Sequence, residues 1–299
     1  MIIGPATLKR TVKQTTGWAA VLSRLLTSGR GHRGACIFYY HRIADIGFVD
    51  SQVDDWNVTP KQFARQIATL SEFAEIVPLV ELISRLNQSP GNDAKPLVCL
   101  TFDDGYANFH TQVLPVLKEY NAPATAFVVT GAVDSRKPML FDHWAQKNLH
   151  RVDSSTWRPL TWRELENCVA SGLVTVGAHS HRHLRGSECT PGRIADEAGE
   201  SRDVLRARLG VAHSLQYAYP YGNTKLGDVS PEYISAVKAA GYQLAVTTDL
   251  GLVEKESNPF CLPRLEAHVL DSPLVMKAKV MGALIPYRVT DHFRGIYRT

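Results

Sequence analysis

The sequence predicts an α/β fold built on a mainly parallel sheet of the barrel type. Short apolar runs alternate with stretches of helical spacing along most of the 299 residues, and repeated strand-then-helix units favour parallel strands. Several apolar runs end in acidic, histidine or Pro-Tyr-Gly groups. In α/β barrels, side chains that carry chemistry follow the carboxyl ends of strands. The length suits a single barrel domain.

Apolar runs and capping signals place the individual elements. Strands are expected at residues 36–40, 97–101, 124–129, 174–178, 215–217 and 243–247. Helices are expected at residues 60–70, 106–120, 162–171, 197–209 and 231–240. Thr59 and Thr161 are suited to begin helices, and Gly172, Gly210 and Gly241 are suited to end them. One linker-like stretch, rich in Asn, Pro and Gly, spans residues 87–95.

The composition excludes several classes of protein. Hydrophobic residues make up 44% of the chain and charged residues 21%, which is typical of a globular protein. The net charge of +4 is mild and no basic stripe is interleaved with aromatic residues, so nucleic-acid binding is not expected. The five cysteines are scattered and lack Cys-x-x-Cys spacing, which argues against a disulfide framework and favours a reducing compartment.

The first part of the chain differs from the rest. Residues 1–34 are expected to form a basic amphipathic segment, and residues 35–299 a single domain. Residues 8–26 could lie on an anionic membrane surface, or pack on the domain itself. No stretch approaches the ~20 apolar residues of a membrane span, and no continuous apolar run marks a secretory signal. A location in the cytoplasm or at the membrane periphery is therefore expected.

Two adjacent carboxylates, Asp103 and Asp104, follow the expected strand at 97–101. Gly105 then lets the backbone turn away at once. Because neighbouring side chains of a strand point to opposite faces, the two acids can divide labour. One can bind a cation while the other serves as a base. The alternative is a structural turn that only closes the strand.

A cluster of histidines follows the expected strand at 174–178. His179 and His183 share one face if the chain enters a helical turn, whereas His179, His181 and His183 share a face if it stays extended. Two histidines and one carboxylate are the usual protein ligands of an open catalytic zinc site. A solvated basic loop is the alternative.

A third segment, residues 218–222, follows the expected strand at 215–217. Pro220 restricts the backbone and Gly222 permits the next bend, so the amide of Tyr221 could be held pointing into a cleft. An ordinary Pro-Tyr-Gly turn explains the same residues.

Together the three segments resemble the NodB-homology polysaccharide deacetylases, carbohydrate esterase family 4. Residues 101–105 match the first motif, Thr-Phe-Asp-Asp-Gly, and His179, Ser180 and His183 match the second, His-Ser/Thr-x-x-His. The resemblance covers residues 36–269 and implies a distorted (β/α)₇ barrel, with 35–299 as the catalytic domain. It also implies that Asp104, His179 and His183 bind a divalent metal, that Asp103 is the catalytic base, and that the amide of Tyr221 is the oxyanion donor.

The chain departs from this family at the residue that orients the base. The third motif usually carries an Arg two residues before the Pro, and this chain has Ala218 there. Arg264, in a strand-like stretch at 262–265, is the candidate replacement. A surface Arg without a special role is the alternative.

The general acid also lies outside the usual position. The family's late Leu-x-His motif is matched only weakly by His268, whereas His41 ends the apolar run at 36–40. A run that ends in His before the first motif resembles a circularly permuted member, similar to deacetylases of bacterial exopolysaccharide export. His41 is therefore preferred to His268 as the acid.

The predicted function is metal-assisted hydrolysis of N-acetyl groups on an amino-sugar polysaccharide or oligosaccharide, releasing acetate. The expected metal is zinc, with cobalt or nickel as alternatives. Two other functions stay open: an O-acetyl esterase or non-sugar amidase on the same scaffold, and a carbohydrate-binding protein without catalytic activity.

Overall fold

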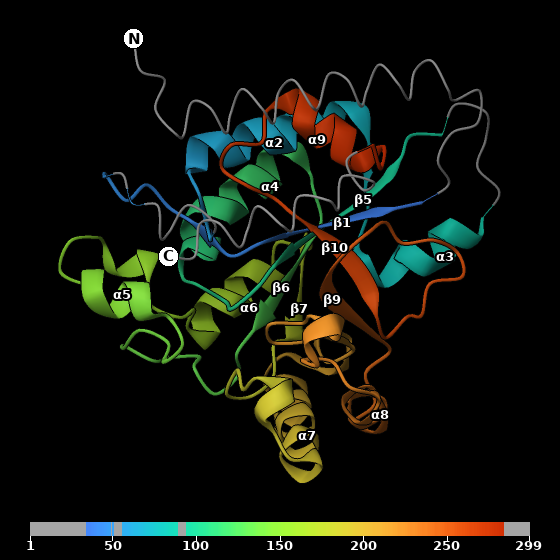
Figure 1. The fold of residues 1–299 in the computed structure, drawn as a ribbon. Helices are drawn as coiled ribbons and strands as arrows, with labels where there is room; N and C mark the ends of the chain where they lie inside the picture. Colours follow the sequence, from blue (N-terminus) through green and yellow to red (C-terminus); the bar gives the residue numbers. More distant parts are fainter. Residues whose placement is uncertain (1–33, 49, 51–55, 89–93, 284–299) are drawn as a thin grey trace.

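The computed structural model describes residues 34–48, 50, 56–88 and 94–283. The predicted N-terminal segment, including residues 8–26, lies outside the described residues except for Gly34. Within these ranges, seven parallel strands close into a barrel surrounded by helices (Figure 1). The predicted (β/α)₇ barrel is therefore confirmed.

The barrel strands lie close to the predicted positions. They are β1 (Cys36–Tyr40), β5 (Leu97–Phe102), β6 (Ala124–Val128), β7 (Val174–Ala178), β8 (Gln216–Ala218), β9 (Leu244–Leu250) and β10 (Leu262–Glu266). Their order is β1-β10-β9-β8-β7-β6-β5, and β1 also pairs with β5. A strand that precedes the first motif thus occupies the closing position of the barrel. A short β4 (Glu75–Ile76) flanks β5, and β2 (Arg42–Ile43) pairs with β3 (Asn57–Val58) in a separate small sheet.

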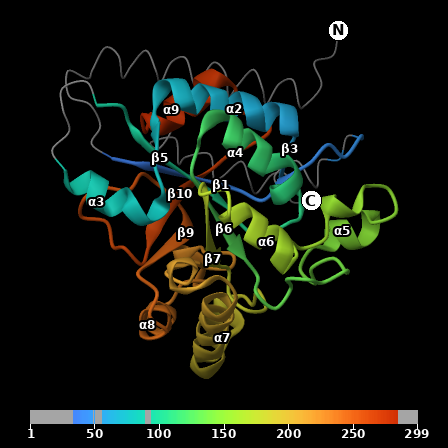
Figure 2. The same ribbon diagram turned by 180° about the vertical axis from the view of Figure 1, so that it is seen from behind.

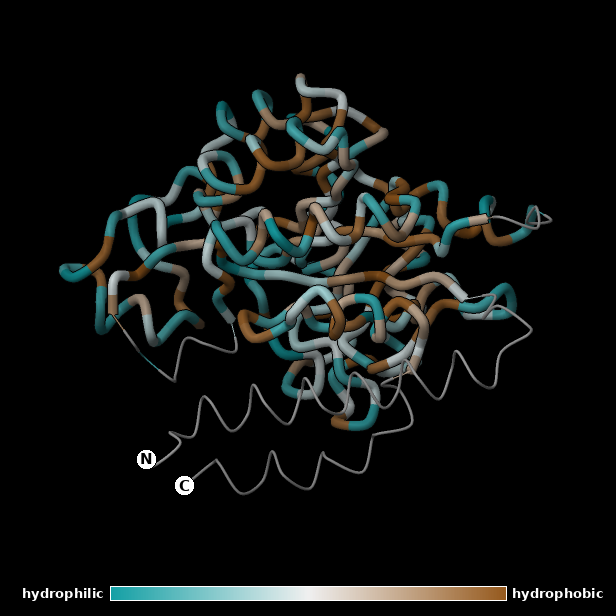
Figure 3. The backbone as a smooth tube through the Cα atoms, turned by 90° about the horizontal axis from the view of Figure 1, so that it is seen from above, coloured by the Kyte–Doolittle hydropathy of each residue, from teal (hydrophilic) through white to brown (hydrophobic). Residues whose placement is uncertain are grey.

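The helices form the outer layer. They are α2 (Pro60–Phe73), α3 (Leu82–Asn87), α4 (Leu114–Tyr120), α5 (His143–Asn148), α6 (Trp162–Val169), α7 (Pro191–Leu209), α8 (Pro231–Ala239) and α9 (Pro273–Val280). Helices α2, α4 and α9 pack together on one side, and α7 and α8 pack together on the opposite side, as the two opposed views agree (Figures 1 and 2). The colour along the outer helices alternates between hydrophobic and hydrophilic, because each has one face on the barrel and one toward solvent (Figure 3).

Short single-turn helices join these elements. The 3₁₀ turns span Leu79–Glu81, Ser154–Thr156, Gly186–Glu188, Val211–His213 and Thr224–Leu226, and a π-helical turn spans Phe109–Val113. Of the helices in the described ranges, none combines the length and the apolar character that crossing a bilayer requires.

Two predicted helices differ from the observed ones. The stretch 106–120 is not one helix, because the π-helical turn precedes α4 and Pro115 has no N–H to continue a regular ladder. Helix α7 begins at Pro191, six residues earlier than predicted, because the Thr190 side chain accepts a hydrogen bond from the Arg193 amide and Pro191 occupies the first turn. The Thr161 cap of α6 is present as a full capping box with Glu164.

Candidate metal and catalytic site

The candidate residues meet at the carboxyl-end rim of the barrel. Asp103 and Asp104 follow β5, His179 follows β7 and His41 follows β1. Tyr40 and Phe102 are partners in the β1–β5 register. The Asp103 amide also donates a hydrogen bond to the Tyr40 carbonyl at 2.8 Å. His41 and Asp103 are therefore adjacent at the carboxyl ends of β1 and β5.

Asp104, His179 and His183 form a buried cluster with ligand atoms facing one another. Asp104 Oδ1 lies 3.5 Å from His179 Nε2 and 3.4 Å from His183 Nε2. One potential ligand atom from each residue falls within 4.8 Å of the others. Two atoms bound to one tetrahedral zinc ion at ~2.1 Å lie about 3.4 Å apart, so these spacings fit an ion.

An unpaired carboxylate oxygen in the same cluster also fits a metal. Within the described part of the chain, Asp104 Oδ1 and His183 Nδ1 are buried and make no hydrogen bond. Buried polar atoms normally have partners, so an unpaired carboxylate oxygen that faces two imidazoles suits a cation-binding position. Burial lowers the pKa of His179, and that of His183 further, which keeps both imidazoles neutral, as metal ligands must be.

The histidine segment is neither helical nor extended. Ser180 has φ 59° and His183 has φ 59°, so two left-handed residues turn the chain and bring His183 back beside His179. Asp104 and Tyr221 also have positive φ, at 72° and 60°. Four of the six non-glycine residues with positive φ in the described ranges thus belong to this site. Such strain concentrates at functional sites because the surrounding structure must hold it.

His179 is oriented by the strand next to its own. Its Nδ1 lies 2.8 Å from the carbonyl oxygen of Ala218, so Nδ1–H donates and Nε2 is left to face Asp104. The ring of His183 stacks on Phe141, with centroids 3.7 Å apart. Ala218, which stands where the family usually has an Arg, therefore orients His179 through its backbone carbonyl.

Asp103 is held by Arg264, which is fully buried rather than on the surface. Arg264 Nη1 and Nη2 donate to the two carboxylate oxygens at 2.8 and 2.7 Å. Its Nε donates to the Thr247 carbonyl at 2.8 Å. Burial alone would raise the pKa of Asp103, but the charge and hydrogen bonds of Arg264, together with the nearby His179 and His41, hold that pKa well below its usual range.

Asp104 has the opposite environment. Burial and the neighbouring Asp103 carboxylate raise its pKa well above the usual range. The two adjacent acids therefore differ in their surroundings. Both oxygens of Asp103 bond the Arg264 guanidinium, whereas Asp104 faces two imidazoles.

The two candidate acids lie in different surroundings. Burial lowers the pKa of His41 to about 4; the charge of Asp103 acts against this, and that of Arg264 reinforces it. His41 therefore interacts electrostatically with Asp103, which follows the neighbouring strand. His268 lies in the turn before α9, where its Nδ1 accepts a hydrogen bond from the Leu270 amide at 3.0 Å. Its carbonyl accepts one from Gln66 of α2 at 2.9 Å.

Tyr221 lies next to the metal-ligand candidates. Tyr221 is 41% exposed, and its ring centroid lies 5.1 Å from that of His183. Within the described ranges its amide donates no hydrogen bond, so this N–H can serve a ligand. Gly222 follows with φ 62°, and a Cβ there would lie 2.9 Å from the Tyr219 carbonyl oxygen. Only glycine suits that position.

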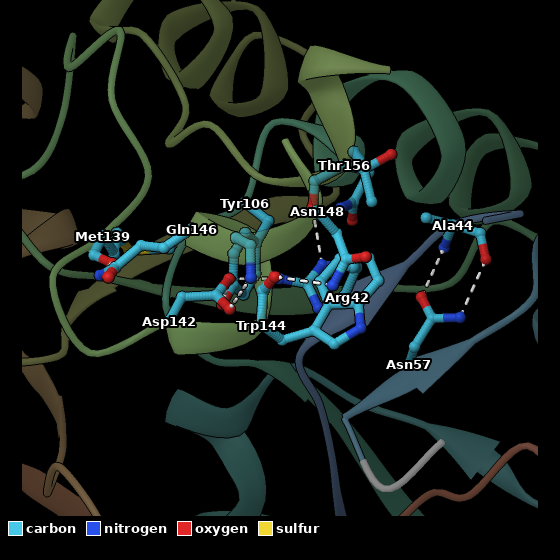
Figure 4. A network of polar contacts seen from close by, with 12 residues as sticks. Arg42, Ala44, Asn57, Tyr106, Met139, Asp142, Trp144, Gln146, Asn148 and Thr156 are labelled. Carbon is cyan, nitrogen blue, oxygen red and sulfur yellow. Dashed lines mark hydrogen bonds and ion pairs between the residues drawn. The ribbon is translucent and has the colours of Figure 1, made fainter. Parts of the chain in front are cut away.

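A buried ion pair that the sequence reasoning missed lies beside the site (Figure 4). Arg42, which follows His41, pairs with Asp142, which follows Phe141. The Tyr106 hydroxyl donates to the same carboxylate at 2.8 Å. This pair connects the segment of the candidate acid with the segment that packs on His183. The only sequence signal is the suitability of Asp142 as a helix cap, because its partner is 100 residues away.

Comparisons with known proteins show the family of the chain. The family model described as "Polysaccharide deacetylase" matches residues 91–245. A poly-beta-1,6-N-acetyl-D-glucosamine N-deacetylase of Staphylococcus aureus (strain MRSA252) is 24% identical over 243 residues, covering 76% of each chain.

Solved structures share the fold. IcaB from Ammonifex degensii has a TM-score of 0.66 and 22% identity, over 84% of this chain and 98% of that chain. The deacetylase PplD of Streptococcus pyogenes, solved in complex with acetate, has a TM-score of 0.65 and 21% identity, over 84% and 99%. Since the family model spans more than half of the sequence, the chain belongs to the polysaccharide deacetylase family.

Proposed function

We propose that this chain is a divalent-metal-dependent hydrolase that removes N-acetyl groups from an amino-sugar polysaccharide of the exopolysaccharide type. The observation that carries the proposal is the contrast between two neighbouring carboxylates. Both carboxylate oxygens of Asp103 accept hydrogen bonds from Arg264. Asp104 Oδ1, in contrast, has no hydrogen-bond partner and faces two imidazole nitrogens. This arrangement suits a base beside a cation site.

Asp104, His179 and His183 would hold the ion, with zinc preferred to cobalt or nickel because two imidazoles and one carboxylate are a common catalytic zinc set. A bound ion supplies Lewis acidity to a carbonyl oxygen and lowers the pKa of a water from ~15.7 towards neutrality. The fit of the three side chains supports this role.

The remaining residues would move protons and hold charge. Asp103, ionised because of Arg264, accepts the proton of the attacking water. The Tyr221 amide donates a hydrogen bond to the oxygen on which negative charge develops. His41 is neutral at pH 7, and negative charge developing on the substrate raises its pKa. The proton that Asp103 accepted can then pass to the imidazole, which delivers it to the leaving nitrogen.

The substrate assignment is supported by the relatives. The matched S. aureus protein is named for poly-beta-1,6-N-acetyl-D-glucosamine, and this chain covers 76% of its length. We propose the same class of polymer, a β-linked N-acetylglucosamine polysaccharide.

A substrate comparison tests the proposal. The zinc-loaded protein is incubated with an N-acetylated β-1,6-glucosamine oligomer and with an O-acetylated sugar, and acetate release is measured. Release from the amide is expected, with loss on chelation, recovery on adding zinc, and loss in Asp103→Asn. Release from the ester alone would favour an O-acetyl esterase. Oligomer binding without any release would favour a carbohydrate-binding protein.

A further inference from the structure

The loop that carries both histidine ligands is attached to helix α7 by one buried carboxylate. The side chain of Glu197, in the first half of α7, is 2% exposed. Its Oε2 accepts hydrogen bonds from two successive backbone amides, those of His181 at 3.0 Å and Arg182 at 2.6 Å. Both amides lie between His179 and His183.

The other side of the loop is held by the segment that follows β6. The Thr130 amide donates to the Ser180 carbonyl at 3.2 Å, and the Gly131 amide donates to the His181 carbonyl at 2.9 Å. The His181 Nδ1 lies 2.9 Å from Thr130 Oγ1, which holds this ring outside the ligand cluster. The loop is thus fixed to the barrel through its carbonyl groups and to α7 through its amides.

The loop needs such support because its conformation is unfavourable by itself. Ser180 and His183 are left-handed, and inside the loop only the Ser180 side chain helps, accepting the His183 amide at 2.9 Å. A non-glycine residue in this region persists only where neighbouring contacts over-determine it. A buried anion that accepts two consecutive amides is one such contact.

The charge of Glu197 is balanced away from the metal cluster. Its Oε1 pairs with Arg182 Nη1 at 3.0 Å and lies 3.8 Å from Arg193 Nη2. The carboxylate is therefore compensated by two arginines and faces the loop from behind.

We propose that Glu197 is a positioning residue for the metal site. By holding the amides of residues 181 and 182, it presents His179 and His183 at the spacing for one ion before the ion arrives. This inference rests on the proposed metal-dependent function. If it is correct, metal affinity depends on Glu197. Turnover of the fully loaded enzyme does not, because Glu197 lies behind the loop and not beside the base or the oxyanion donor.

The chain offers a matched control one helical turn further along. Glu200 contacts the same two loop residues through their side chains, Arg182 Nη1 at 2.9 Å and His181 Nε2 at 3.6 Å, but its own side chain is 45% exposed and bonds no loop amide. Glu197→Gln removes the charge behind the loop amides at nearly constant size. Glu200→Gln removes only the exposed ion pairs.

The experiment measures zinc affinity of the metal-free full chain by competition with a chromophoric chelator, and kcat as a function of free zinc. Glu197→Gln should weaken zinc binding roughly 10–100-fold, as loss of an outer-shell partner does, with kcat at saturating zinc retained. Glu200→Gln should stay within about twofold of the parent. Parental zinc affinity in a folded Glu197→Gln variant, or equal weakening by both variants, would overturn the proposal.

A measurement on the unaltered protein covers the case in which Glu197→Gln does not fold. Hydrogen exchange of the metal-free parent should show strong protection of amides 181 and 182, and exchange at the rate of open loops would refute preorganisation. A parent that binds no divalent ion would remove the proposed function and this role together. A parent that binds zinc with unprotected amides would remove this role alone.

Discussion

Arg264 and Asp103 are 161 residues apart in the sequence and make a fully buried, bidentate ion pair, with contacts of 2.8 and 2.7 Å. Both arms of the guanidinium are used on one carboxylate, which fixes its plane as well as its charge. The pair stands where the family pattern would place an Arg from the segment at 218. Arg264 thus contacts Asp103 from β10, whereas an Arg at position 218 would come from β8.

The pair predicts a change in pH dependence. Arg264 lowers the pKa of Asp103 and burial raises it, so Arg264→Gln should let burial dominate and raise that pKa. Because a base must be deprotonated, the acid limb of kcat/KM should move to higher pH, and less so in Arg264→Lys, which keeps the charge. Metal content measured at each pH controls for loss of the ion. An unmoved limb would contradict the assignment.

Arg264→Gln should also destabilise the fold. Removing one partner of a buried pair leaves an uncompensated charge, which typically costs about 3–5 kcal/mol. Urea unfolding at pH 7 should show this loss. Arg264→Gln combined with Asp103→Asn should recover part of it, because the buried charge is gone. A double variant no more stable than Arg264→Gln would argue against a direct pair.

The adjacent acids should separate metal binding from chemistry. Asp103→Asn is expected to keep its metal content while losing turnover, because the ligands remain and the base does not. Asp104→Asn is expected to lower metal affinity, because it weakens a proposed ligand. Metal analysis of both purified variants beside an acetate-release assay checks this. Parental metal content and activity in Asp104→Asn would refute its place as a ligand.

The position of the acid can be tested with two histidine variants. His41→Ala should reduce kcat by roughly 10²–10⁴ with metal retained, as expected for loss of a general acid. His268→Ala is the matched control and should leave kcat near the parent value, because its ring accepts a hydrogen bond from the Leu270 amide in the turn before α9. The reverse ranking of the two variants would move the acid to His268.

His213 predicts a pH-dependent stability outside the site. Its Nδ1 accepts the Val176 amide of β7 at 3.1 Å, and burial lowers its pKa from the usual 6.5. Between the folded and unfolded pKa values the unfolded chain binds more protons, so this contribution to stability falls as pH drops below about 6.5. Urea midpoints of His213→Gln should therefore depend less on pH than those of the parent.

An exposed histidine supplies the control for that series. His150→Gln should leave the pH dependence of the midpoint as it is in the parent. If His213→Gln and His150→Gln change it equally, the buried hydrogen bond to β7 is not its source.

The barrel and the ends of its strands follow from local sequence. The runs at 36–40 and 174–178 match β1 and β7 in full. Each such run is mainly apolar, because strands of a parallel barrel are buried on both faces. The groups at their carboxyl ends had to meet at one rim, so the strand pattern is enough to place Asp103, Asp104 and His179 together.

The orientation of those groups depends on tertiary contacts. The left-handed backbone at Ser180 and His183 and the amide contacts of Glu197 have no local signal. The cap position of Asp142 does not reveal its pairing with Arg42. Arg264 could be proposed as a partner of Asp103, but its burial and both contacts required the closed barrel. The physical reason is that each of these contacts joins elements that are separate in the chain. Local propensity sets which residues form a strand, whereas long-range packing sets what the side chains at its end will touch.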